Sequence, residues 1–180
     1  MHKDISEILF TREQINEKVN KIAKELDKTY GEEEVVMVCI MKGSLPFYAD
    51  LVRAVSFPAY FDFMCVSSYG ASTTTSGELK MKLDLSMDVE NKHVLIVEDI
   101  LDTGNTLYNL REMLTKRNPK SLRICALLDK PARRLRDIEA DFRGFEIPDA
   151  FVVGYGLDYN EHYRNLPYIG ILKPEVYTNR

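Results

Sequence analysis

The sequence predicts an α/β fold in which helices flank a mostly parallel central sheet. Short apolar runs rich in β-branched residues, such as VVMVCI (35–40) and HVLIVEDI (93–100), indicate strands. Because the core of each run is apolar rather than alternating, these strands are expected to be buried on both faces, as in a parallel sheet. Segments with helical spacing separate the runs, which is typical of repeated strand–helix units.

The first helix is expected to begin after Thr11 and to end near Gly31. Thr11-Arg-Glu-Gln14 has the form of a capping box, and the apolar residues that follow recur at helical spacing. After the strand at 35–40, Ser44 and Pro46 mark the start of a second helix, which runs to about Val55.

The same alternation continues through the rest of the chain. We expect strands at 60–66, 78–85, 93–100, 122–130, 151–157 and 166–172, and a helix at about 105–116. The segment 67–87 is rich in Ser, Thr and Gly, and a loop of this length within a compact domain is typical of a flexible functional lid. The length of 180 residues fits a single domain, 1–180.

Composition and charge exclude several classes of function. The net charge is −4 and the Lys and Arg residues are dispersed, so no basic face for a nucleic acid is predicted. No run approaches the roughly 18 apolar residues of a membrane span, and the first residues lack the apolar core of a signal peptide. The three cysteines, Cys39, Cys65 and Cys125, lie inside apolar runs without paired spacing. A cytoplasmic protein is therefore expected.

One segment, VLIVEDILDTGNTL (94–107), carries a candidate functional site. An apolar strand delivers Glu98 and Asp99 to the carboxyl edge of the sheet, where open α/β folds bind ligands. Asp102 follows, and then Thr103-Gly104-Asn105-Thr106 leads into a helix whose first amides can bind phosphate. Carboxylates beside a phosphate cradle suit a sugar phosphate with Mg²⁺. The Gly-Lys-Ser/Thr of a P-loop is absent.

This segment resembles the phosphoribosyl pyrophosphate (PRPP) motif of type I phosphoribosyltransferases. The resemblance extends over about 35–175 and points to the hypoxanthine-guanine branch of that family. It is carried also by Lys42-Gly43, Ser68-Tyr69, Asp129-Lys130-Pro131 and FVVGYGLDYNEHYRNLPYIG (151–170). It implies the type I phosphoribosyltransferase fold, with a lid loop at about 67–87 and a small purine-binding hood at about 145–180. It also implies a homodimer or homotetramer.

The resemblance implies a Mg²⁺-dependent transfer of phosphoribose from PRPP to a 6-oxopurine, hypoxanthine or guanine, giving IMP or GMP. Asp102 would be the general base near purine N7. The residues implied for PRPP, pyrophosphate and phosphate are Lys42, Gly43, Ser68, Tyr69, Glu98, Asp99, Asp102, Thr103, Gly104, Asn105, Thr106 and Arg164. Those implied for the purine are Lys130, Phe151, Val152 and Asp158, and those for Mg²⁺ are Glu98, Asp99 and Asp158.

Some details of the resemblance carry their own physical consequences. The family commonly has a cis peptide before the residue that Lys42 matches, and it often has Lys where this chain has Asn105. An ammonium group at Lys130 would bind the exocyclic oxygen of a 6-oxopurine and disfavour adenine, whose 6-amino group is itself a donor.

Two other functions remain open from the sequence. Some proteins of this fold bind RNA and keep the PRPP loop, but an RNA binder should have a basic face, and the net charge of −4 argues against one. A kinase or phosphohydrolase could use Glu98 and Asp99 for Mg²⁺, but the missing P-loop counts against that class.

Overall fold

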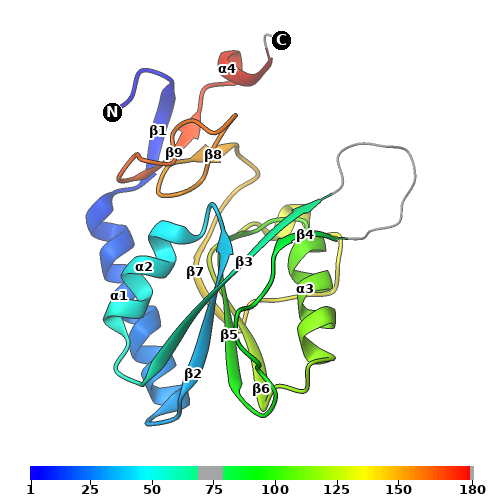
Figure 1. Ribbon diagram of the computed structural model, residues 1–180. Coiled ribbons are helices and arrows are strands. Elements are labelled where there is room, and N and C mark those ends of the chain that lie inside the picture. The colour runs from blue at the N-terminus through cyan, green and yellow to red at the C-terminus, as the bar shows by residue number, and fades with distance from the viewer. Residues whose placement is uncertain (69–78, 179–180) are drawn as a thin grey trace.

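A six-stranded sheet forms the centre of the computed structural model, which describes residues 1–68 and 79–178 (Figure 1). The strand order is β4-β3-β2-β5-β6-β7. The strands span Ala59–Ser68 (β3), Val35–Met41 (β2), Leu79–Leu83 (β4), His93–Leu101 (β5), Ser121–Asp129 (β6) and Phe142–Glu146 (β7). All neighbours pair parallel except β3 and β4, which pair antiparallel, so the predicted mostly parallel sheet is confirmed.

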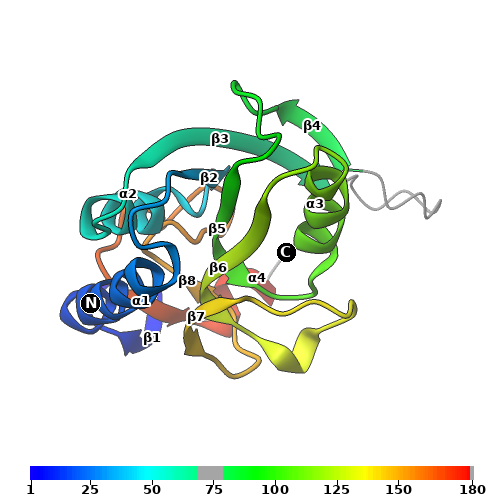
Figure 2. The same cartoon turned by 90° about the horizontal axis from the view of Figure 1, so that it is seen from below.

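Helices cover both faces of this sheet (Figure 2). Helices α1 (Arg12–Tyr30) and α2 (Leu45–Ala54) lie on one face, and α3 (Asn105–Thr115) lies on the other. Successive residues of β2 serve the two cores in turn: Met37 and Cys39 pack with α1 and α2, whereas Val36 and Val38 pack with α3. Period-two alternation between two apolar layers explains why the strand is apolar throughout.

The ends of α1 lie where the sequence predicts them. The Thr11 hydroxyl accepts a hydrogen bond from the Gln14 amide at 3.3 Å, and the Gln14 side chain accepts one from the Thr11 amide at 2.8 Å. The helix ends at Tyr30, and Gly31 follows with a φ of 60°. The capping box and the glycine stop are both confirmed.

A second, three-stranded antiparallel sheet lies above one end of the central sheet (Figure 1). Its order is β1 (Ile5–Phe10), β9 (Ile169–Leu172) and β8 (Val152–Val153), and the short helix α4 (Pro174–Thr178) follows β9. Strands from the two ends of the chain therefore build one layer, which we call the hood sheet.

Several element boundaries differ from the sequence expectations. Strands β1 and β7 were not predicted, and β1 carries two register shifts that break the alternation of its pattern. The apolar run 151–157 forms only the two residues of β8, because Gly154 and Gly156 have positive φ values and turn the chain. The last strand is shorter than 166–172, and β4 is shorter than 78–85.

The predicted lid, 67–87, is described only in part. Residues 69–78 lie outside the described residues. Tyr69 belongs to this range, so its expected role stays a prediction. Residues 79–83 form β4, which pairs with β3 beside the central core. Within the described ranges, no helix is long and apolar enough to cross a membrane.

Candidate functional site

The acidic pair of the motif lies inside strand β5 rather than after it. The pairing of β5 with β6 continues from Glu98↔Ala126 to Leu101↔Asp129, whereas its pairing with β2 stops at Cys39↔Val97. From Glu98 onward, the edge of β5 that faces β2 therefore no longer pairs with β2. The two carboxylates lie at the carboxyl edge of the sheet, where parallel α/β folds bind ligands.

The two carboxyl groups are held in an environment that disfavours negative charge. Burial and the neighbouring Asp99 raise the pKa of Glu98 well above its usual value. Oε2 of Glu98 is buried and has no hydrogen-bond partner among the residues that the structure describes. Burial also raises the pKa of Asp99 to about 6, although the Ile100 amide, at 2.7 Å from Oδ1, lowers it. A cation at this point would relieve both groups.

The turn after β2 approaches Asp99 closely at Gly43. The Met41–Lys42 peptide before it is cis. A Cβ built on Gly43 would lie 1.9 Å from Oδ2 of Asp99, so a larger residue there would require the carboxylate to move. In turn, a Cβ on Gly156 would lie 1.9 Å from the Gly43 carbonyl oxygen. The turn after β2 therefore meets the Asp99 side chain of β5 on one side and the main chain of the segment after β8 on the other.

An ion-pair network joins this turn to the segment after β8. Nζ of Lys42 lies 3.1 Å from Oε2 of Glu161, and Nη2 of Arg164 lies 3.4 Å from the same oxygen. Nη2 of Arg164 also lies 2.9 Å from Oδ1 of Asp158, and its Nη1 donates to the Gly156 carbonyl at 2.8 Å. Two predicted pyrophosphate-binding cations, Lys42 and Arg164, are thus brought together.

The turn between β5 and α3 presents main-chain amides at the start of the helix. Gly104, the N-cap residue, has a φ of 81° and no side chain to cap the helix, and the Asn105 amide makes a long hydrogen bond to Oγ1 of Thr103 at 3.4 Å. A cavity of about 210 Å³ is lined by Glu98, Ile100, Leu101, Asp102, Thr103, Gly104, Thr106 and Leu107. An uncapped helix N-terminus beside a small cavity suits an anion such as phosphate. The Asn105 side chain instead accepts a hydrogen bond from Nε of Arg136 at 2.8 Å.

Asp102 and Lys130 lie at the ends of neighbouring strands. The Asp102 carboxylate is about one-third exposed, with Nε of Arg133 at 3.5 Å from Oδ1. The Lys130 amide donates to the Leu101 carbonyl at 3.0 Å, which ties the two strand ends together. The Lys130 side chain is 6% exposed, and its Nζ donates to the Ala150 carbonyl at 2.9 Å and lies 3.7 Å from Oδ1 of Asp149.

Phe151 directly follows Ala150, the residue whose carbonyl Lys130 binds, and presents an aromatic ring. The ring is partly exposed, and Tyr177 of α4 stacks on it with centroids 5.0 Å apart and planes inclined by 24°. Tyr159 meets it edge-on at 5.6 Å. Val152, the next residue, is 7% exposed within β8. One supported and partly exposed aromatic ring suits the stacking of a planar base.

Replacing Phe151 with Ala should weaken purine binding and leave PRPP binding unchanged. A lost base–aromatic stack typically costs about 1–3 kcal/mol. Calorimetric titration of the purine nucleotide measures the effect. Phe145→Ala is the matched control, because Phe145 stacks on Phe10 at 3.9 Å and lines no part of this site. Equal nucleotide affinity in the two variants would make Phe151 an ordinary packing residue.

The structure brings most of the predicted site residues to one edge. The side chain of Ser68, the last residue of β3, is not described, and Tyr69 lies outside the described residues. Three residues at the site were not predicted from the sequence, namely Arg134, Glu161 and Tyr177. Of the three, Arg134 belongs to a short basic cluster formed by Lys130, Arg133, Arg134 and Arg136, and Glu161 lies within the segment 151–170 that carries the resemblance.

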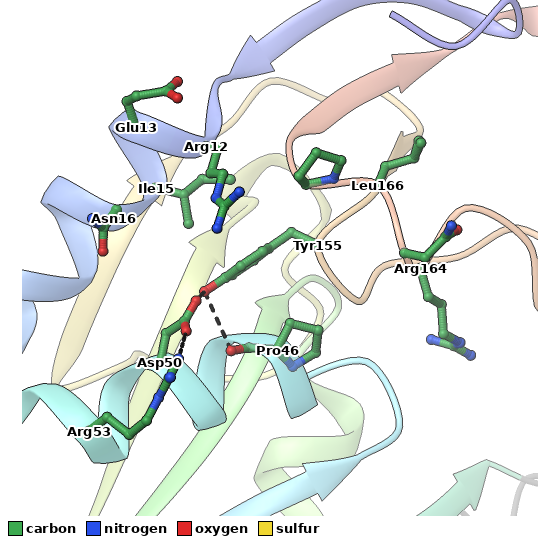
Figure 3. Close-up of a pocket in the computed structure, with 12 residues that line it drawn as sticks. Arg12, Glu13, Ile15, Asn16, Pro46, Asp50, Arg53, Tyr155, Arg164 and Leu166 are labelled. Carbon is green, nitrogen blue, oxygen red and sulfur yellow. Dashed lines mark hydrogen bonds and ion pairs between the residues drawn. The ribbon is translucent and has the colours of Figure 1, made fainter.

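A cavity of about 640 Å³ lies between α1, α2 and the segment that carries Tyr155 (Figure 3). The Tyr155 ring reaches toward α2, and its hydroxyl donates to Oδ2 of Asp50 at 2.6 Å. Tyr155 has a φ of 49° and lies between Gly154 and Gly156. The tyrosine thus anchors the turn that places Gly156 against Gly43.

Replacing Gly156 with Ala should reduce both stability and PRPP binding. The residue has a φ of 99°, and the added Cβ would meet the Gly43 carbonyl. Gly31→Ala is the matched control, because Gly31 also has a positive φ, 60°, but nothing lies within 4 Å of its Cβ position. The control should lose only the cost of backbone strain, about 1–3 kcal/mol of unfolding free energy, whereas Gly156→Ala loses more and raises the KM for PRPP. If Gly156→Ala and Gly31→Ala had equal free energies of unfolding in urea and equal KM values for PRPP, the close approach of Gly156 to Gly43 would be contradicted.

Comparison with known proteins shows the family of this chain. The model of the phosphoribosyl transferase domain matches residues 7–160. The chain belongs to the phosphoribosyltransferase family. It is 52% identical over 179 residues to a hypoxanthine-guanine phosphoribosyltransferase of Bacillus subtilis, covering 99% of each chain.

Solved structures of phosphoribosyltransferases share the fold. The crystal structure of a hypoxanthine phosphoribosyltransferase from Staphylococcus aureus is 51% identical, with a TM-score of 0.95 over 98% of this chain and 96% of that one. The hypoxanthine phosphoribosyltransferase of Trypanosoma cruzi, in complex with the product IMP, is 42% identical, with a TM-score of 0.93 over 98% and 99%. The type I phosphoribosyltransferase fold predicted from the sequence is therefore confirmed.

Proposed function

We propose that the protein is a purine salvage enzyme that transfers phosphoribose from PRPP to hypoxanthine or guanine, giving IMP or GMP and pyrophosphate. This function is supported by one observation: three parts of the site lie together at one edge of the central sheet. These are the Glu98-Asp99 pair, the uncapped turn 103–106 and the buried ammonium of Lys130. The similarity to hypoxanthine-guanine phosphoribosyltransferases over nearly the whole chain supports the same reaction.

The reaction exchanges one bond at C1 of the ribose. The bond between C1 and the pyrophosphate oxygen breaks, and a bond between C1 and purine N9 forms. The proton on N7 passes to the Asp102 carboxylate, which acts as the general base. Because the developing ribose cation resembles that of glycosyl transfer, holding the ribose and the leaving group in place is central to the rate.

Each part of the edge has a role in binding. The amides of 103–106 hold the 5′-phosphate, and Glu98 and Asp99 bind the ribose hydroxyls. Lys42, Gly43 and Arg164 bind the pyrophosphate, with Ser68 and Tyr69 assigned beside them from the sequence. Phe151 stacks on the purine, and the main chain of Val152 reads its edge.

The same carboxylates fit Mg²⁺. The described residues contain no group of three potential ligands close together, but Oε2 of Glu98 is buried without a partner, which a cation would satisfy. We assign Glu98 and Asp99 to one Mg²⁺ and Asp158 to a second, held through water. Bound Mg²⁺ would neutralise the charge of the leaving pyrophosphate.

Lys130 selects the base. Its ammonium already donates to the Ala150 carbonyl, so it is oriented and retains further hydrogens. A 6-oxopurine oxygen can accept one of them, whereas the 6-amino group of adenine cannot.

Nucleotide synthesis from PRPP and Mg²⁺, measured with hypoxanthine, guanine, xanthine and adenine, tests the proposed function. Hypoxanthine or guanine should be converted, and adenine should be converted far more slowly. Adenine turnover equal to that of hypoxanthine would contradict the role of Lys130, and no product with any base would overturn the proposal.

We also infer a cytoplasmic homodimer or homotetramer with one domain and a hood at about 145–180. Large apolar side chains are exposed on α2 and β3, including Leu45 at 46%, Tyr60 at 44% and Phe61 at 52%. Leu45 begins α2, and Tyr60 and Phe61 lie near the start of β3, so exposed apolar side chains at both places are available to a subunit interface. Light scattering after gel filtration checks this, and a monomer at micromolar concentration would contradict it.

A further inference from the structure

Arg134 forms a bridge between the ends of β5 and β6. Its Nη1 donates to the Leu101 carbonyl at 2.9 Å and also to the Asp102 carbonyl, and its Nη2 donates to Oδ1 of Asp129. The pair is largely removed from water, with the Arg134 side chain 17% exposed and that of Asp129 5% exposed. One guanidinium group therefore holds the main chain of Asp102 against the residue that precedes Lys130.

The bridge has a geometry that only arginine can make. A guanidinium group presents several donors in a fixed plane, so it can bind two carbonyls and a carboxylate at once. A lysine ammonium is a compact charge on a flexible stem and can keep the ion pair with Asp129 without fixing all three acceptors.

Neighbouring residues brace the same turn. The Leu135 amide donates to the Thr103 carbonyl at 2.9 Å, and Arg136 binds the Asn105 side chain. A Cβ on Gly104 would lie 2.6 Å from Cγ2 of Ile138 and 3.3 Å from Cδ of Arg134. The segment 134–138 thus lies directly against the turn 102–105. Within this segment, the Arg134 side chain alone makes the three hydrogen bonds to Leu101, Asp102 and Asp129.

We propose that Arg134 is a positioning residue, which holds the proton acceptor Asp102 and the base-selecting Lys130 at a fixed separation across the two strand ends. This inference rests on the proposed function. The two side chains must reach the N7 and the 6-oxygen of one purine ring, which are themselves a fixed distance apart. Loss of the bridge should therefore affect catalysis and base selection together.

The test compares Arg134→Lys and Arg134→Met with Arg143→Met. Arg143 is the matched control, because its Nη1 lies 3.4 Å from Oδ2 of the same Asp129 but its side chain is 59% exposed and it makes no bond to β5. The measurements are kcat and KM with hypoxanthine and with PRPP, the ratio of hypoxanthine to adenine conversion, and the thermal unfolding midpoint.

Both Arg134 variants should lose about 100-fold in kcat with hypoxanthine, since misplacement by about 1 Å can cost that much. The KM for PRPP should change little, and the ratio of hypoxanthine to adenine conversion should fall. Arg143→Met should match the wild type in kcat, in the KM for PRPP and in the ratio of hypoxanthine to adenine conversion. If Arg134→Met fails to fold, Arg134→Lys decides, because it keeps a positive charge beside Asp129.

Wild-type kcat and wild-type base selection in Arg134→Lys would overturn the inference. So would an equal loss with both purines that follows the unfolding midpoint, because that pattern is expected of a residue that only stabilises the fold. Wild-type protein that makes no nucleotide from PRPP would overturn the proposed function and this inference with it. An active wild type with an insensitive Arg134→Lys would overturn this inference alone.

Discussion

Replacing Asp102 with Asn should lower kcat by about 10²- to 10⁴-fold, the usual effect of removing a general base. The amide has nearly the same shape as the carboxylate but cannot accept the purine proton at neutral pH. The substitution gives up the ion pair between Oδ1 of Asp102 and Nε of Arg133, 3.5 Å apart, but an exposed pair of this kind contributes little to stability. The KM for PRPP and the unfolding midpoint should therefore remain close to those of the wild type.

Steady-state kinetics with hypoxanthine measure the effect of Asp102→Asn. The matched control is Asp137→Asn, which makes the same chemical change at an exposed position of the adjoining segment 134–138. A kcat for Asp102→Asn within threefold of that control, roughly 0.7 kcal/mol in activation free energy, would remove Asp102 from the proton transfer.

Replacing Lys130 with Met should lower kcat/KM for hypoxanthine by roughly 10- to 100-fold, since a hydrogen bond from a charged group contributes about 1.5–3 kcal/mol. Methionine has a similar length and suits a buried site. The fall in kcat/KM is therefore caused by the missing ammonium group and not by a cavity. Discrimination against adenine should decrease in the same variant, because the donor that disfavours a 6-amino group is gone.

Lys92→Met is the matched control for Lys130→Met. Nζ of Lys92 also donates to a main-chain carbonyl, that of Asp88, at 2.7 Å, but the side chain is exposed at the other end of β5. Competition between hypoxanthine and labelled adenine measures the discrimination. An unchanged ratio in Lys130→Met would mean that another group selects the base.

The parts of the site that lie close together in the sequence were predictable. Glu98, Asp99, Asp102 and the turn 103–106 belong to one strand–turn–helix segment, and that order itself places carboxylates beside free amides. The central sheet was predictable for a similar reason, because an apolar strand between two helical layers has a distinctive composition.

The remaining parts depend on contacts between distant segments. Strand β1 is held by β9 at the opposite end of the chain, and Lys42 meets Glu161 across 119 positions. Arg134 was visible only as one of a short basic cluster, and nothing in its neighbours indicates that it binds the carbonyls of Leu101 and Asp102. Such pairings follow from the packing of the whole fold, which local patterns do not contain.

A crystal structure of the protein with IMP tests the proposed site most directly. The account predicts the 5′-phosphate on the amides of 103–106, the ribose hydroxyls at Glu98 and Asp99, and the purine between Lys130 and Phe151 with its 6-oxygen toward Nζ of Lys130. A nucleotide bound with its base away from Lys130, or in the cavity beside Tyr155, would contradict it.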